Sequence, residues 1–131
     1  MFSIHSTSSD RQLCFLRRSG DDFVVELLSD SLKARLSVSA YTDRFGLLEL
    51  FEKLGAATLP WPDEQRWASL ESEFELSASC SVSGHVLFRV SLRDLFGSPE
   101  EWQVVVGITS ELGQLPAIAA QARIFFAGEH A

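Results

Sequence analysis

The chain has 131 residues, of which 46% are hydrophobic and 22% charged, a size and composition typical of one globular domain with a substantial hydrophobic core. Its net charge of −7 and its 11 scattered lysines and arginines argue against a nucleic-acid-binding surface, which requires clustered cations. No apolar run approaches the ~20 residues that cross a bilayer, and the N-terminus lacks a secretory signal pattern, so we expect a cytoplasmic protein.

The first forty residues are expected to form four strands joined by short turns. Residues 32–41 give the clearest signal, because apolar and polar side chains alternate along them, which predicts a strand with one buried face. Residues 18–21 and 29–31 have the composition of turns. The four expected strands span residues 2–6, 12–17, 22–28 and 32–41.

The register of the hairpin made by the last two of these strands follows from side-chain pairing. With residues 29–30 as the loop, Leu27 faces Leu32 on the apolar side of the sheet. Glu26 then faces Lys33 on the other side, so opposite charges are paired. A shift of one residue would place every side chain on the wrong face.

Two amphipathic segments predict helices. The first opens at Thr42, whose hydroxyl can accept a hydrogen bond from an amide of the first turn, and we expect Gly55 to end it in the left-handed conformation. The second begins near Pro116, which suits a first helical turn, and Gly128 is expected to stop it. Its apolar positions are Ile118, Ala119, Ala122, Phe125 and Phe126.

The central hairpin is the clearest element of the chain. Residues 73–81 and 85–93 both alternate, and a three-residue loop over 82–84 is needed to keep the apolar residues of both strands on one face. Gly84 would then take the left-handed position that such loops require. The predicted pairs are Cys80 with Val86, Ala78 with Phe88, Leu76 with Val90, Phe74 with Leu92 and, outside, Glu73 with Arg93.

Strands and helices follow one another in separate runs, which is typical of α+β folds with antiparallel sheets. We therefore predict one domain over residues 1–131, with one antiparallel sheet of about six or seven strands built from hairpins and two helices packed on one face. The other face is expected to be solvated and rich in Ser, Glu and Arg. The last strand is expected at residues 101–109, with Trp102, Val104, Val106 and Ile108 toward the core.

No chemistry-bearing residue type forms a catalytic or metal-binding pattern. His5, His85 and His130 have no second ligand at metal-binding spacing, and a role for His85 stays open. Cys14 and Cys80 fall on apolar positions, so we expect buried free thiols in a reducing compartment. The paired carboxylates lie in turns or on a polar strand face, where they are solvated. We expect no catalytic residue, no cofactor and no metal, in a protein that is not an enzyme.

The most unusual segment, residues 59–71, places two tryptophans and an arginine in a connection between elements. Trp and Arg contribute much of the binding energy in protein interfaces, which makes this segment a candidate binding surface. Alternatively, the tryptophans close the gap between helix and sheet and the arginine binds a carbonyl or carboxylate. Both interpretations hold if one tryptophan is buried and the other exposed. The candidate protein-binding residues are Trp61, Asp63, Glu64, Arg66 and Trp67.

Three motifs give the chain a family resemblance: Trp-x5-Trp-x3-Glu from Trp61, Gly-His-Val at 84–86 and Phe-Phe at 125–126. With them the chain resembles a family of small uncharacterised bacterial proteins, a domain of unknown function. Those proteins are similar in turn to the immunity proteins that accompany WapI-type contact-dependent toxins. The family has a Gly before its first Trp where Pro60 stands here, so that turn is expected to differ. The resemblance implies the same order of elements and no catalytic residues.

We therefore expect a non-catalytic protein-binding domain with one specific protein partner, and an immunity protein that neutralises a cognate toxin is one candidate. An acidic domain suits the occlusion of a basic target. One alternative is a carrier of a small apolar ligand in a pocket between sheet and helices. A third hypothesis is a structural domain that associates through its sheet edges. No nucleic-acid or membrane partner is expected.

Overall fold

Two antiparallel sheets of four strands each and two helices make up this α+β fold, which the computed structural model describes over residues 1–40, 43 and 45–127. The first sheet holds β1 to β4 in chain order and the second holds β5 to β8 in chain order. The strands are β1 (Phe2–His5), β2 (Gln12–Ser19), β3 (Asp22–Ser29), β4 (Leu32–Ser39), β5 (Gln65–Ala68), β6 (Phe74–Cys80), β7 (His85–Arg93) and β8 (Gln103–Glu111), and the helices are α1 (Gly46–Gly55) and α2 (Leu115–Ala127).

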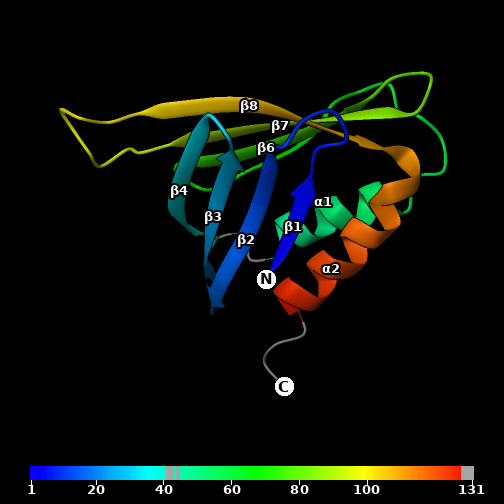
Figure 1. Cartoon of the computed structure of the whole chain (residues 1–131). Helices are drawn as coiled ribbons and strands as arrows, with labels where there is room; N and C mark the ends of the chain where they lie inside the picture. The colour runs from blue at the N-terminus through cyan, green and yellow to red at the C-terminus, as the bar shows by residue number, and fades with distance from the viewer. Residues whose placement is uncertain (41–42, 44, 128–131) are drawn as a thin grey trace.

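The predicted single sheet of about six or seven strands is wrong, because the strands divide into two groups where α1 interrupts them. Figure 1 shows the strands of the first sheet running across those of the second. Each sheet has one apolar face, and the two faces cover each other: the ring centroids of Phe15 in β2 and Phe74 in β6 are 6.0 Å apart. The second group reaches four strands through β5, which the sequence pattern had assigned to a connection.

The predicted register of the β3–β4 hairpin is wrong by two residues. Ser29 pairs with Leu32, so the loop consists of residues 30–31, and Glu26 lies opposite Arg35 instead of Lys33. A shift of two keeps every side chain on its predicted face, so Phe23, Val25 and Leu27 are buried as expected. The charge pairing also survives, with Arg35 Nε 3.7 Å from Glu26 Oε2.

The predicted register of the β6–β7 hairpin is confirmed at every pair from Cys80 with Val86 to Phe74 with Leu92. Gly84 has φ +86°, as the three-residue loop requires. Just before β6, Glu73 also lies opposite Arg93, whose N–H donates to the Glu73 carbonyl at 2.8 Å.

The ends of α1 differ from the prediction. The helix begins at Gly46, after Phe45, and Thr42 lies outside the described residues. Gly55 does not take the left-handed conformation, because the helix ends through the αR residue Ala56, whose N–H donates to the carbonyl of Glu52. A Cβ at Gly55 would stand 2.5 Å from the Cβ of Ala119 in α2, so the glycine allows the two helices to approach closely.

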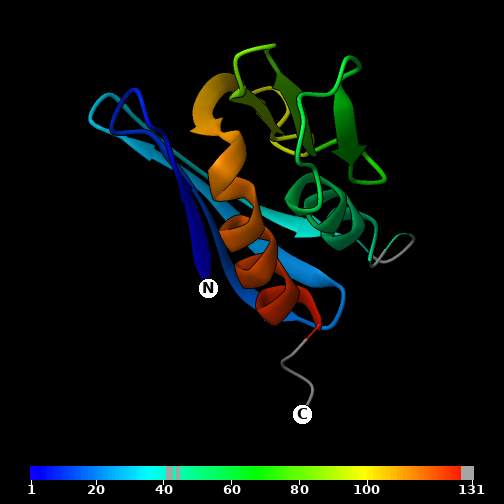
Figure 2. The same cartoon turned by 90° about the vertical axis from the view of Figure 1, so that its right-hand side faces the viewer.

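The two helices close the open side of the paired sheets. Figure 2 shows α2 lying along the first sheet and α1 beneath the strands of the second. In α2, the predicted apolar positions are buried, apart from Ile118, which is half-buried, and Gly128 lies outside the described residues. The ring of Phe2 stacks on Phe15 at 4.6 Å and lies edge-on to Phe125 at 5.5 Å, so both ends of the chain meet in one core.

The last strand, β8, begins at Gln103, two residues later than predicted. Trp102 therefore lies just before the strand and is 36% exposed, although it was expected in the core. Val104 and Val106 are half-buried and Ile108 is fully buried.

Both cysteines are free thiols, as predicted. Cys14 is buried as expected, whereas Cys80 is only half-buried. Neither of the two described helices has the length and apolar content to span a membrane.

Candidate functional site

The two tryptophans of the candidate segment contribute to the fold. Trp67 is 7% exposed, and its Nε1 donates to Oδ2 of Asp43 at 2.9 Å. Trp61 is half-buried, and its Nε1 donates to the carbonyl of Ala78 at 3.1 Å. Each indole N–H thus has a partner inside the molecule, and both rings fill the space between α1 and the second sheet.

The charged residues of the segment lie outside. Asp63 and Glu64 are exposed, and Arg66 forms an ion pair with Glu75 on the open face of the second sheet. The alternation along β5 explains the separation, because Arg66 and its neighbour Trp67 point to opposite faces of the strand. The structure therefore brings Glu64 and Arg66 together on one surface and turns the tryptophans away from it.

The open face of the second sheet carries a row of polar side chains across three strands. Arg66 in β5 pairs with Ser77 in β6, and Ser77 pairs with Arg89 in β7. The side chains of Arg66 and Arg89 are both exposed. These residues line an open depression of about 250 Å³. Its lining residues include Glu64, Arg66, Glu75, Ser77, Arg89 and Ser91. Acidic and basic side chains are interspersed here. Such a surface suits polar contacts with a protein and does not form a site for an anion or a cation.

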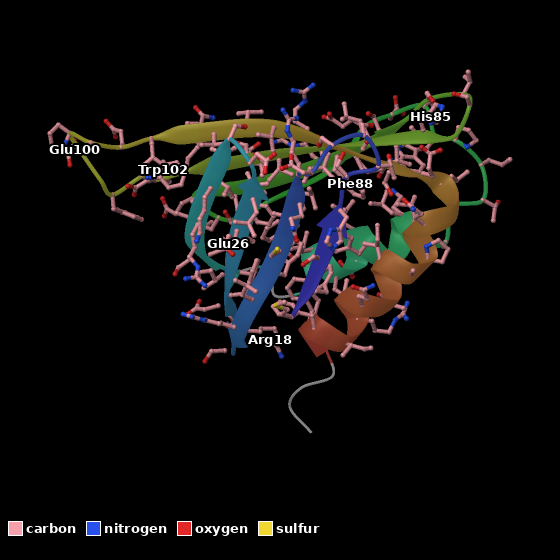
Figure 3. All side chains as sticks on the ribbon, in the orientation of Figure 1. Arg18, Glu26, His85, Phe88, Glu100 and Trp102 are labelled. Atoms are coloured by element: carbon pink, nitrogen blue, oxygen red, sulfur yellow. The ribbon has the colours of Figure 1, made fainter. Side chains whose placement is uncertain are left out.

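A second surface lies at one end of the same sheet, where the β5–β6 and β7–β8 connections meet. It presents Phe96, 87% exposed, Leu70, 62% exposed, and the partly exposed Trp102. We refer to Leu70, Phe96 and Trp102 as the aromatic end. Figure 3 shows Trp102 and Glu100 on the connection that projects from this end, with His85 at the opposite end of the sheet.

The connection that holds Phe96 is a structured turn. The N–H of Phe96 donates to Oδ1 of Asp94 at 3.2 Å, and the N–H of Asp94 donates to the carbonyl of Trp102 at 2.9 Å. A further backbone bond joins the N–H of Glu100 to the carbonyl of Gly97. These bonds fix a backbone that holds a large apolar ring in solvent, where burial does not stabilise it.

Beside Phe96, the surface is hollowed between this connection and the first sheet. The depression has a volume of about 340 Å³ and is open to solvent. One of its walls comes from Arg17, which has φ +52° at a bulge of β2, a conformation uncommon for residues other than glycine. The polar lining residues include Arg17, Asp22, Ser37, Ser39 and Glu73.

Other candidate groups do not gather into a reactive site. Nδ1 of His85 lies 2.9 Å from Oε2 of Glu111, and both side chains are exposed. Within the described part of the chain, no group of three or more His, Cys, Asp or Glu side chains could hold a metal ion. Over the same residues, no buried side-chain nitrogen or oxygen lacks a hydrogen-bond partner. His130 lies outside the described residues.

The aromatic end was not predicted from the sequence. Phe96 follows a strand and precedes the turn residues Gly97 to Pro99, and a phenylalanine in such a place usually packs on the core. The sequence contains one indication that this connection is a solvent-exposed surface: it carries the acidic residues Asp94, Glu100 and Glu101 and no basic residue.

Comparison with known proteins identifies a family and no individual relative. The model of a family of unknown function, DUF6228, matches residues 5–129. No curated protein and no solved structure matches the chain significantly.

Proposed function

We propose, for a chain that belongs to the DUF6228 family of unknown function, that it is a non-catalytic protein-binding domain whose partner docks on the aromatic end. The main observation behind this proposal is that Phe96 is 87% exposed although its turn is ordered by hydrogen bonds, among them the one from the Phe96 N–H to Asp94. Aromatic side chains are enriched in protein interfaces, where burial against a partner supplies the stabilisation that solvent does not.

The acidic residues around the aromatic end indicate what kind of partner surface would complement it. The connection from Asp94 to Glu101 carries three acidic residues and no basic one, and Glu71 and Glu73 lie on the neighbouring β5–β6 connection. A basic surface with an apolar hollow for the Phe96 ring would complement this end in both shape and charge. The open depression beside the ring would receive a side chain of the partner in return.

The charged residues first singled out by the sequence take a secondary place in this proposal. Arg66 and Glu64 lie on the open face that adjoins the aromatic end through β5 and β6. Exposed charges at the rim of an interface alter association rates and salt dependence more than affinity. We propose that Asp63, Glu64 and Arg66 act at the rim, while Trp61 and Trp67 hold the segment in place.

The test compares Phe96→Ala with the matched control Val82→Ala. Val82 is 97% exposed at the opposite end of the same sheet, so both changes remove an exposed apolar side chain. We expect wild type and Val82→Ala to capture one stoichiometric partner from a lysate of the native host. Phe96→Ala should weaken that complex about tenfold or more, as measured by calorimetry with the purified partner. Equal affinity of all three proteins would refute the assignment of the aromatic end.

A finer form of the proposal is that the partner is a toxin which the domain neutralises. It is supported by the motif resemblance to proteins related to WapI-type immunity proteins and by the acidic binding end, which suits a basic target. Expression of the captured partner alone should then arrest growth of a heterologous host. Co-expression of wild type should restore growth, and Phe96→Ala should not. A captured partner without toxicity leaves the binding function intact and rejects this finer form.

The alternative function, transport of a small apolar ligand, finds little support among the described residues. The mostly apolar hollow beside Leu54 and Trp61 has a volume of about 90 Å³, which is small for a ligand-binding pocket. Packed rings and aliphatic side chains occupy the space between the sheets and helices. The hollows at Phe96 and Arg66 are open and partly polar, unlike the enclosed apolar pockets that hold such ligands.

A further inference from the structure

On the outer edge of β8, the backbone N–H and carbonyl groups of alternate residues point away from β7. The N–H of Thr109 donates to Oγ of Ser6 at 3.3 Å, and its carbonyl accepts from the N–H of Thr7 at 3.0 Å, so both groups point away from β7. The pairing of β8 with β7 keeps one register throughout, so every second residue repeats this orientation. Gly107, Val105 and Gln103 therefore also point their N–H and carbonyl groups outward.

The loop that follows β1 covers only part of this edge. It binds Thr109 through Ser6 and Thr7, and Nη1 of Arg11 donates to the carbonyl of Gly107 at 3.0 Å. Beyond Gly107, no described residue forms a hydrogen bond with the outward groups of Gln103 and Val105. An unpaired stretch of about four residues is therefore left at the start of the strand.

The other three edges carry the features that normally prevent strand addition. The strand β1 has four residues and lies against α2, β4 has exposed Lys33 and Arg35, and β5 has four residues with exposed Arg66. By contrast, β8 has nine residues, and its only charge is Glu111 at the covered end. The uncovered part reads Gln-Val-Val-Val, which has high β propensity and nothing that repels another strand.

We propose that β8 pairs antiparallel with β8 of a second copy of this chain, with Val104 at the twofold axis. In this register Gln103 exchanges hydrogen bonds with Val105 of the second copy, so outward groups meet outward groups on both sides. On the core-facing side, Trp102 lies opposite Val106 of the second copy. The proposal accounts for the partial exposure of Trp102, Val104 and Val106, which have a core-facing register but no neighbouring strand to cover them.

Charge complementarity supports a second copy as the occupant. The same register places Glu101 opposite Gly107 of the second copy, which is where that copy's Arg11 is held. Registers displaced by two residues lose this match. In one of them Glu101 lies opposite Thr109, which the loop after β1 already covers. In the other, Glu101 lies opposite Val105, two residues away from the Gly107 carbonyl that Arg11 binds. Within one chain, Glu101 and the Arg11 site are about 20 Å apart along the strand, so the pair forms only between copies.

The first experiment measures mass in solution by sedimentation over a wide range of protein concentrations. We expect wild type to shift from 14.5 kDa toward twice that mass as concentration rises. Val105→Lys should abolish the shift, because it places a charge beside the axis on a residue that is 49% exposed. The matched control Val82→Lys introduces the same charge in the exposed β6–β7 loop, away from the β8 edge, and should dimerise like wild type. A monomer at every concentration overturns the proposal, as does a dimer that Val105→Lys leaves intact.

A charge exchange tests the register. Glu101→Arg alone and Arg11→Glu alone should each weaken dimerisation, and the double variant should restore it. Thermal unfolding of each variant shows that the monomer is folded, which separates loss of pairing from loss of structure. Failure of the double variant to recover dimerisation rejects the Val104-centred register. The dimer register uses Trp102 and Glu101 of the aromatic-end connection but not Phe96. Because these readouts require no partner protein, their failure leaves the binding test at Phe96 intact.

Discussion

Trp67 shows how a residue type common in interfaces can serve the interior of a fold. Its indole N–H reaches Asp43, which precedes α1, and its ring lies 6.1 Å from that of Phe74 in β6. The Asp43 carboxylate in turn lies against Gly46, where an added Cβ would stand 2.1 Å from Oδ2. Trp67 therefore joins the second sheet to the start of the helix.

We predict that Trp67→Ala lowers the free energy of unfolding by about 3–5 kcal/mol, the usual effect of truncating a buried aromatic residue. Trp67→Phe keeps most of the ring and loses the bond to Asp43, for which we expect about 1 kcal/mol. Urea denaturation measures both changes. Phe96→Ala is the control, with a change within about 0.5 kcal/mol because its ring is exposed. A wild-type unfolding free energy for Trp67→Ala would mean that the ring does not stabilise the core.

For individual residues, the sequence identified the segment 59–71 as unusual but did not determine which of its side chains are buried. The side chains of Trp61 and Trp67 find their partners, Ala78 and Asp43, through tertiary contacts that no local pattern encodes. The outward position of Arg66 follows from strand alternation, but β5 is only four residues long and two prolines precede it, so it has no clear strand signal. The exposure of Phe96 depends on how its turn is held, which the sequence does not reveal.

Among the elements, the crossing of α1 and α2 depends on one glycine. The Cβ of an alanine at Gly55 would stand 2.5 Å from the Cβ of Ala119 and 3.4 Å from the carbonyl oxygen of Leu115. Side chains in contact at that distance must move apart, and here the backbone of α2 limits the movement. The close approach explains why a glycine is placed in the last turn of α1, where it weakens the helix itself.

We predict that Gly55→Ala destabilises the protein by about 1–3 kcal/mol through overpacking. Ala119→Gly alone should cost about 1 kcal/mol from helix propensity. The double variant should lose less stability than the sum of the two, because the second change removes the clash that the first creates. The control is Gly113→Ala, whose added Cβ meets no atom within 4 Å. Additive effects in denaturant titrations would contradict this explanation.

The two predicted hairpins show what limits inference of a strand register. In β6–β7, the alternation of both strands requires an odd loop, and Gly84 marks the position with positive φ, so one register satisfies both conditions. In β3–β4, a shift by two preserves the faces. Lys33 and Arg35 both suit Glu26, so neither pattern nor charge could choose between two registers. Both registers leave a two-residue turn, so they differ only in whether residues 29–30 or residues 30–31 form it.

For the whole molecule, the sequence pattern predicted the order of every strand and helix except β5 and most of the buried positions, but not the number of sheets. Alternation defines which residues face inward, and it is the same whether strands join one sheet or two. The division depends on the segment around α1, which carries the chain from β4 on one side of the core to β5 on the other. This is a long-range property, and local patterns contain no information about it.

Although there are two sheets, the hydrophobic core is continuous, and Phe15 lies at its centre. Its ring is fully buried and lies against Phe51 of α1, Phe74 of the second sheet and Phe126 of α2. We predict that Phe15→Ala lowers the free energy of unfolding by about 3–5 kcal/mol. Both sheets should still unfold in one transition, so that tryptophan fluorescence from the second sheet and far-ultraviolet circular dichroism give the same midpoint. Two separate midpoints would show that the sheets unfold independently.

The contact between Phe2 and Phe125 has a consequence for synthesis on the ribosome. The first strand emerges early, but its apolar neighbours in α2 are translated only after the whole second sheet. During elongation the first sheet is therefore a nascent intermediate with an uncovered apolar face, of the kind that chaperones bind. Phe2 and Phe126 are in contact although they are more than a hundred positions apart, so the core is completed only after residue 126 has emerged from the ribosome. Contacts of such long sequence separation generally slow folding.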